Sequence, residues 1–232
     1  MMIHTLPGIS PKPGPAYLES TGYLDWKTES VRRFTEKTVA GEQSDIGRAI
    51  KLFYAVRDDW RYDPFAIRLI PETYRASYVL TAKSAYCIQK AILLAALARA
   101  VGICAGIGLS NVVNHLCTEK LRKRMGGTNL FRHHGYAVLY LGGKWIKAAP
   151  AFNLGLCQRF GVVPTEFDGH SDAIFQEFDA NNRRHMEYVE DHGMWSDFPY
   201  ELVAKDFRAY YPRELWTEAP EEEKFEDGVL VR

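Results

Sequence analysis

The sequence predicts a protein of mixed helices and strands, in which one buried helix packs against an antiparallel sheet. Residues 87–100 contain neither Gly nor Pro, and Gly102 follows where a helix favours a left-handed residue. Apolar side chains lie on nearly every face of this helix, which places it inside the core. Residues 136–141 and 144–148 have the pattern of two strands, and Gly142-Gly143 between them is typical of a two-residue hairpin turn.

Other segments predict the elements around this centre. Residues 28–39 and 44–58 have apolar positions at helical spacing, and Ser44 is a good cap for the second helix. We expect Ser84 to cap the buried helix in the same way, and residues 103–109 to form the strand that follows it. Further along, residues 183–190 alternate like a strand, and a helix is expected from about residue 196 until Pro212 stops it.

Cys87 lies in the first turn of the buried helix. Unpaired N–H groups and the positive end of the helix dipole favour a thiolate there, so we expect a lowered thiol pKa. A thiolate held by a rigid helix is suited to nucleophilic catalysis. The alternative is a buried structural thiol, which is a common fate of cysteine.

His134 stands at the start of the first hairpin strand. A base at this position could lie over the N-terminus of a helix that packs against the sheet. Cys87 and His134 together therefore indicate a thiol and its proton acceptor.

These residues together resemble the transglutaminase-like superfamily. The matching segments are Cys87 and the end of its helix at residues 97–105, the histidine strand at 134–140, and the second strand at 143–150 with Trp145. A hydrophobic helix followed by an aspartate and a tyrosine, at residues 50–62, also matches. The resemblance covers about residues 45–155, and the order and spacing of the motifs are more specific than any single motif.

The resemblance implies an α+β fold of the papain-like, transglutaminase-like type, with a Cys-His-Asp triad in which Cys87 and His134 match two members. The family aspartate falls in a W-x-x-x-D-P pattern, and this chain has Ala149 there, which cannot orient an imidazole. Because side chains alternate along an extended strand, Asn153 would share a face with position 149. Asn153 could then hydrogen-bond His134, as Asn does in papain-like sites. Asp168 is the second candidate.

Length and composition bound the remaining possibilities. The 232 residues are 47% hydrophobic, and we expect a single transglutaminase-like domain over 1–232, with a core at about 28–155 and a C-terminal extension, 156–232, packed on it. Twenty-nine basic residues balance twenty-nine acidic ones, which gives no reason to expect nucleic acid or an anionic membrane as partner. No feature specifies an oligomeric state.

Cysteine usage and the N-terminal segment predict a cytoplasmic protein. The four cysteines form no C-x-x-C pair, and a chain of this length needs no disulfides, so we expect a reducing compartment. Residues 1–7 lack a basic and apolar signal pattern, and the longest nearly apolar run, residues 91–98, is too short to span a bilayer.

The segment 111–133 is longer than a hairpin needs, and segments of this length often cover sites. Its basic residues are interpreted as a solvated face rather than as a binding site for an acidic substrate. His115, Cys117 and the pair His133-His134 do not have the spacing of a zinc site. We expect no metal and no cofactor.

The favoured function is cysteine-nucleophile acyl transfer on amide or peptide bonds. Cys87 would attack the carbonyl carbon, His134 would move the proton, Asn153 would orient His134, and the Cys87 N–H would bind the oxyanion. The substrate would be a peptide, a protein or a small amide. Eukaryotic transglutaminases carry a Trp beside the Cys, and Ile88 stands here, which favours a peptidase or amidase over a transglutaminase.

Two other functions remain open from the sequence. The first is a catalytically inactive member of the superfamily that binds peptides or proteins, which the missing aspartate favours. The second is acyl transfer from a thioester carrier, as in arylamine N-acetyltransferases, although the N-terminal motifs of that group are absent.

Overall fold

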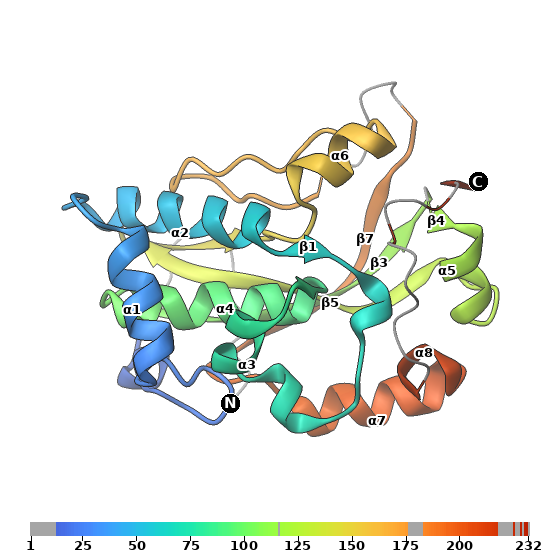
Figure 1. Cartoon of the computed structure of the whole chain (residues 1–232), viewed down its shortest axis with the longest axis horizontal. Coiled ribbons are helices and arrows are strands. Elements are labelled where there is room, and N and C mark those ends of the chain that lie inside the picture. The colour runs from blue at the N-terminus through green and yellow to red at the C-terminus, as the bar shows by residue number, and fades with distance from the viewer. Residues whose placement is uncertain are drawn as a thin grey trace.

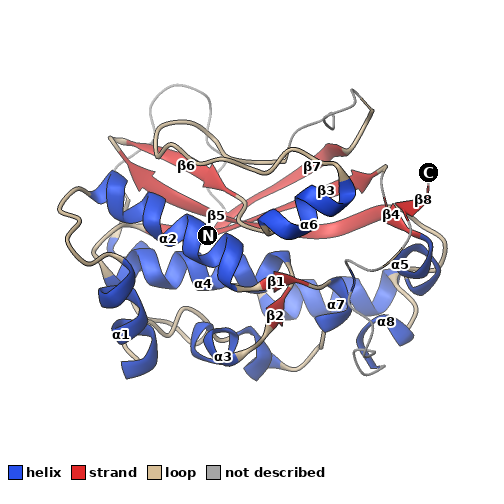
Figure 2. Cartoon of the chain, turned by 45° about the horizontal axis from the view of Figure 1, so that its top comes forward, coloured by secondary structure: helices blue, strands red, loops and turns tan. Residues whose placement is uncertain are grey.

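The computed structural model describes residues 13–115, 117–175, 183–217, 225, 228 and 230–231. Figures 1 and 2 show a twisted sheet with most of the helices gathered on one of its faces, and α4 (Cys87–Ala100) lying between the sheet and the other helices. This arrangement confirms the α+β fold with a buried Cys-bearing helix packed on an antiparallel sheet.

The main sheet has four strands in the order β6-β5-β3-β7, and every neighbouring pair is antiparallel. The strands are β3 (Ala105–Asn114), β5 (Leu130–Leu141), β6 (Lys144–Ala148) and β7 (Met186–Trp195). Gly142 and Gly143 join β5 to β6 with φ angles of +56° and +84°. A two-residue turn that twists with its strands needs two positive φ angles, which glycine adopts without steric cost.

Two short pairings tie distant segments together. β1 (Arg61–Tyr62) pairs in parallel with β2 (Ser84–Ala85), directly before α4. β4 (Cys117–Thr118) pairs antiparallel with β8 (Leu230–Val231). The first pairing corrects the expected cap of α4: Ser84 belongs to β2, and the N-cap of the helix is Tyr86. The side-chain oxygen of Gln89 accepts a hydrogen bond from the Tyr86 N–H.

The other helices are short apart from α2. They are η1 (Pro15–Tyr17), α1 (Glu29–Thr38), α2 (Asp45–Asp59), η2 (Pro64–Ala66), η3 (Pro71–Tyr74), α3 (Ala76–Thr81), α5 (Glu119–Arg124), α6 (Leu154–Phe160), α7 (Tyr200–Tyr210) and α8 (Glu214–Thr217). The two predicted helices before residue 60 are confirmed as α1 and α2, and the Ser44 hydroxyl accepts a hydrogen bond from the Gly47 N–H at 3.0 Å. None of the helices in the described part of the chain is long and apolar enough to cross a bilayer.

α4 is buried along its length, with only its last residue partly exposed, because it packs on β5 and β3 on one side and on α1, α2 and α3 on the other. Two long cations on this helix bind backbone carbonyl groups inside the core. Lys90 Nζ donates to the carbonyl oxygens of Arg57, Trp60 and Ala151, each at 2.8 Å. Arg99 donates to those of Glu19, Ala105 and Ser196. The helix is thereby fixed to several segments at both of its ends.

The part of the chain after residue 155 contributes to both layers. β7 extends the sheet beside β3, and α7 lies on the helical side, next to α8 in Figures 1 and 2. The predicted strand and helix in this region are confirmed as β7 and α7, although β7 continues to Trp195. The predicted boundaries of 1–232, with a core at 28–155, stay a prediction.

Candidate active site

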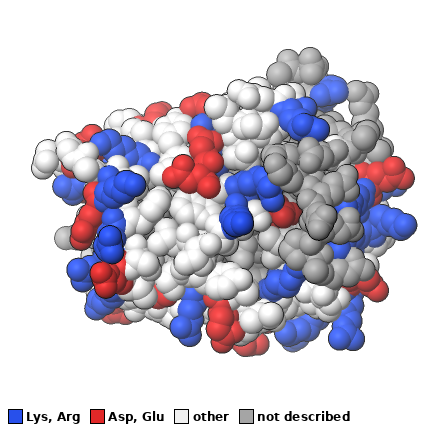
Figure 3. Space-filling model, viewed as in Figure 1, with Lys and Arg blue, Asp and Glu red and all other residues white. Residues whose placement is uncertain are grey.

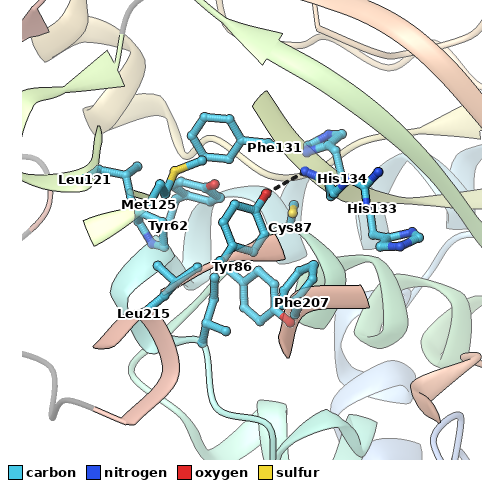
Figure 4. Close-up of a pocket in the computed structure, with 14 residues that line it drawn as sticks. Tyr62, Tyr86, Cys87, Leu121, Met125, Phe131, His133, His134, Phe207 and Leu215 are labelled. Atoms are coloured by element: carbon cyan, nitrogen blue, oxygen red, sulfur yellow. Dashed lines mark hydrogen bonds between the residues drawn. The ribbon is translucent and has the colours of Figure 1, made fainter. Parts of the chain in front are cut away.

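Cys87 is the first residue of α4 and has 8% of its surface exposed. It lines a cavity of about 30 Å³, room for one or two water molecules. The walls come from segments that are far apart in the sequence, and they include Tyr62, Leu121, Phe131, His133, His134 and Tyr211. Figure 4 shows Cys87 among these largely aromatic side chains, with both histidines on the β5 side. The structure therefore brings Cys87 and His134 to one cavity.

Gly135 permits the close approach of the histidine strand to the Cys helix. A Cβ atom at this position would lie 2.7 Å from the Ile88 Cα, which is closer than real Cβ atoms come. With no side chain in the way, the Gly135 N–H reaches the Cys87 thiol as a hydrogen-bond donor. A glycine next to His134 thus sets the distance between β5 and the tip of α4.

Burial raises the pKa of the Cys87 thiol to about 11. The N–H groups of Gly135, Ile88 and Cys87 oppose this rise, but burial is the larger influence. The expectation of a lowered thiol pKa is therefore wrong. The helix N-terminus is placed as predicted, but the apolar walls of the cavity remove the water that a thiolate would need.

His134 is a buried imidazole with 5% of its surface exposed. Its ring packs against Phe175, with ring centres 5.0 Å apart, and lies near Tyr188. Its Nε2 has no hydrogen-bond partner among the described residues. Burial lowers the pKa of His134 to about 4, so the ring is neutral at neutral pH. A neutral imidazole can accept a proton, but no described carboxylate holds this one in place.

The residues proposed to orient His134 lie elsewhere. Asn153 Oδ1 accepts a hydrogen bond from the Tyr62 N–H at 2.9 Å and so ties the segment after β6 to β1. Asp168 is exposed, and its Oδ1 accepts hydrogen bonds from the backbone N–H groups of His170 and Ser171, both at 2.7 Å. Ala149 is buried at the family position of the aspartate. The structure joins neither Asn153 nor Asp168 to His134 by a hydrogen bond.

His133 is the functional candidate that the sequence did not single out. Its Nε2 lies 2.8 Å from Oδ2 of Asp206 in α7, and Oδ1 of the same carboxylate lies 2.7 Å from Arg132 Nη1. His133 Nδ1 is buried and has no partner among the described residues. The tandem histidines were visible in the sequence, but Asp206 is 73 residues away, and no local pattern connects the two.

The remaining polar groups of the site show no metal centre. Among the residues that the structure describes, no group of three or more His, Cys, Asp or Glu side chains is arranged to hold a metal ion.

Comparison with known proteins places this chain in a family. Residues 32–150 match the family model of the transglutaminase-like superfamily, and no curated protein matches the chain. A solved structure of a candidate cysteine protease from Cytophaga hutchinsonii is similar to this chain, with 14% sequence identity and a TM-score of 0.45. The similarity covers 77% of this chain and 53% of the other, so this chain spans about half the length of that protein. Since the family model matches half of the sequence, the chain belongs to the transglutaminase-like superfamily.

Proposed function

We propose that this protein is a cysteine-dependent acyl-transfer enzyme that hydrolyses amide bonds in a peptide, a protein or a small amide. The observation that carries the proposal is the shared cavity: Cys87 at the tip of a buried helix lines it together with the two imidazoles of β5. Membership of the transglutaminase-like superfamily supports a cysteine nucleophile at this position.

The chemistry starts from a neutral thiol and a neutral imidazole. As the Cys87 Sγ attacks the carbonyl carbon, an imidazole of β5 accepts the thiol proton, and the carbonyl oxygen becomes an oxyanion. The N–H groups of the first turn of α4 are suited to stabilise that oxyanion. The imidazolium then gives its proton to the departing amine as the C–N bond breaks. Water attacks the thioester by the reverse of these steps, and free Cys87 is regenerated.

Hydrolysis is preferred over transamidation because of the residue beside the nucleophile. Ile88 occupies the place of the Trp that neighbours the Cys in eukaryotic transglutaminases, so their means of guiding an amine to the thioester is incomplete here. Figure 3 shows basic and acidic side chains interspersed on the face in view, in a chain that has twenty-nine of each.

The second candidate is a catalytically inactive module that binds a peptide or protein. Three observations favour it: the small volume of the cavity, the raised thiol pKa of Cys87, and a His134 Nε2 that no described residue meets with a hydrogen bond. Catalysis requires the side chains around the cavity to move when a substrate arrives, because a peptide bond does not fit into about 30 Å³.

The test is incubation with a peptide library, with and without a labelled primary amine. We expect hydrolysis by the wild-type protein and at least a ~10³-fold loss in Cys87→Ala, because Cys87 is the one thiol among the described residues that line the cavity. Cys157→Ala is the matched control, since Cys157 is a buried cysteine in α6, away from the cavity. Amine incorporation that exceeds hydrolysis would identify a transglutaminase instead. If no peptide is turned over and Cys87 resists alkylation, the protein is the catalytically inactive binding module described above.

A further inference from the structure

We propose that the general base of this site is His133, held by the carboxylate of Asp206 from α7. The inference rests on the proposed function and names the residues that carry out its proton transfer. The family aspartate falls directly after β6, at the position of Ala149 in this chain. The carboxylate that contacts a cavity-lining imidazole here comes instead from α7. In this scheme His133 is a catalytic residue and Asp206 a positioning residue.

The hydrogen bonds fix how the His133 ring is presented. Nε2 of His133 is 2.8 Å from Asp206 Oδ2. Because a carboxylate oxygen only accepts, Nε2 carries the ring proton and donates a hydrogen bond to Asp206. Nδ1 is then the basic nitrogen, and it is buried without a partner in a ring that lines the Cys87 cavity. The same division of roles is found in papain-like sites, where one ring nitrogen serves the thiol and the other is held by an oriented side chain.

Asp206 is itself held in place. Its second oxygen, Oδ1, lies 2.7 Å from the guanidinium of Arg132, so each oxygen of the carboxylate has a different cationic or N–H partner. Tyr211, which follows α7, accepts the Arg132 N–H at 2.7 Å and donates to the Leu130 carbonyl at 3.0 Å. These bonds connect α7 to the start of β5 and keep Asp206 opposite His133.

The backbone at His133 is bent out of regular strand geometry. The β3–β5 register shifts between Ser110 and Val112, which places a β-bulge at the two residues before His134. His133 has a φ of +55°, a left-handed value that is uncommon for a residue other than glycine, and its N–H donates to Asn111 Oδ1 at 3.1 Å. Bulges redirect side chains next to active sites, and this one turns the His133 ring toward α7.

Burial keeps His133 neutral at neutral pH, so it can act as a base. Burial, His192 on β7 and Arg132 on β5 lower the pKa of His133, and Asp206 on α7 raises it, with a net lowering. The ring is therefore neutral and able to accept a proton. When it takes the Cys87 proton, the carboxylate of Asp206 stabilises the imidazolium until the proton passes to the departing amine. Within the described ranges, no carboxylate is hydrogen-bonded to His134.

The experiment compares three variants of the full chain on a peptide that the wild-type protein hydrolyses in a Cys87-dependent way. We expect His133→Gln to lower kcat at least ~10³-fold and Asp206→Asn ~10²- to 10⁴-fold, each with little change in KM. His134→Gln, which alters the lining of the same cavity, should lower kcat less than His133→Gln does. Asp206→Glu, which keeps the carboxylate, should restore part of the kcat lost in Asp206→Asn.

A pH profile separates a positioning role from a structural one. Because Asp206 raises the pKa of His133, Asp206→Asn should move the acid limb of kcat/KM to lower pH, whereas mere loss of structure would not move its midpoint. Retained kcat and an unmoved acid limb in both His133→Gln and Asp206→Asn, with turnover lost in His134→Gln, would overturn the assignment.

Alkylation of Cys87 by iodoacetamide identifies the proton acceptor of the thiol even if the wild-type protein turns over no peptide. A plot of the alkylation rate against pH should show an inflection that disappears in His133→Gln and persists in His134→Gln. The opposite result would assign the thiol's proton acceptor to His134. Absent turnover with the expected inflection would refute the proposed function while leaving the His133–Asp206 pair in place.

Discussion

At the level of single residues, burial away from water decides the protonation state of the Cys87 thiol. A helix N-terminus stabilises a negative charge by about 0.3–2 kcal/mol. Raising the thiol pKa of Cys87 from 9.0 to about 11 corresponds to about 3 kcal/mol in the other direction. Burial therefore outweighs the helix dipole, and Cys87 must lose its proton during the attack rather than before it.

The pH dependence of stability should report the burial of His134. Its pKa is lowered from 6.5 to about 4, so between these values the unfolded chain binds a proton that the folded protein does not. The contribution of the neutral His134 ring to the free energy of unfolding is fully present above pH 6.5 and is lost as the pH falls toward 4. For this residue alone, the free energy of unfolding at pH 5 should be about 2 kcal/mol below that at pH 7.

Urea unfolding at pH 5 and pH 7, in wild type and in His134→Gln, measures that contribution. We expect the difference between the two pH values to shrink by about 2 kcal/mol in the variant. An unchanged difference would mean that His134 is not a buried neutral imidazole.

At the level of elements, the site depends on the contact between β5 and the first turn of α4. Gly135 of β5 lies directly against Ile88 in that turn. Gly135→Ala places a Cβ atom 2.7 Å from the Ile88 Cα and 3.1 Å from the Ile88 nitrogen, so the strand or the helix must move. We expect a loss of about 1–3 kcal/mol in the free energy of unfolding.

The same substitution should lower Cys87-dependent turnover by more than tenfold, because it shifts both histidines relative to the thiol. Gly22→Ala is the matched control, since a Cβ at Gly22 would meet nothing within 4 Å. Wild-type stability and turnover in Gly135→Ala would show that β5 and α4 are not in the close contact described.

At the level of the whole molecule, α4 is joined to the rest of the chain by buried cations rather than by apolar packing alone. Lys90 Nζ reaches three carbonyl groups, two at the end of α2 and one after β6. Its pKa is lowered to about 7 by burial, so its three hydrogen bonds are needed to satisfy the ammonium group inside the core.

Lys90→Met should destabilise the fold strongly. The substitution keeps the length of the side chain but leaves three buried carbonyl oxygens without this donor, and each costs about 1–3 kcal/mol. We expect a loss of at least about 3 kcal/mol in urea unfolding. Lys51→Met is the control, because Lys51 donates a single bond, to the Ala40 carbonyl at the surface, and should change stability by less than about 0.5 kcal/mol. Equal losses in the two variants would contradict this role of Lys90.

The sequence by itself determined the central elements of this protein and the family to which it belongs. The buried helix, the β5–β6 hairpin and the capped helix α2 follow from hydrophobic periodicity, glycine turns and caps. These signals act over a few residues, so they can be seen without a structure. The position of Cys87 at a helix N-terminus was determined in the same way.

Only the tertiary structure decided the charge state of Cys87 and the hydrogen-bond partners of the histidines and Asn153. The thiol pKa depends on which side chains exclude water, and those come from η2, α5, β5, α7 and α8. Asn153 bonds the Tyr62 N–H instead of His134, and Asp206 meets His133 across 73 residues. Such contacts leave no periodic trace in the sequence, because they are set by how distant segments pack and not by local conformational preference.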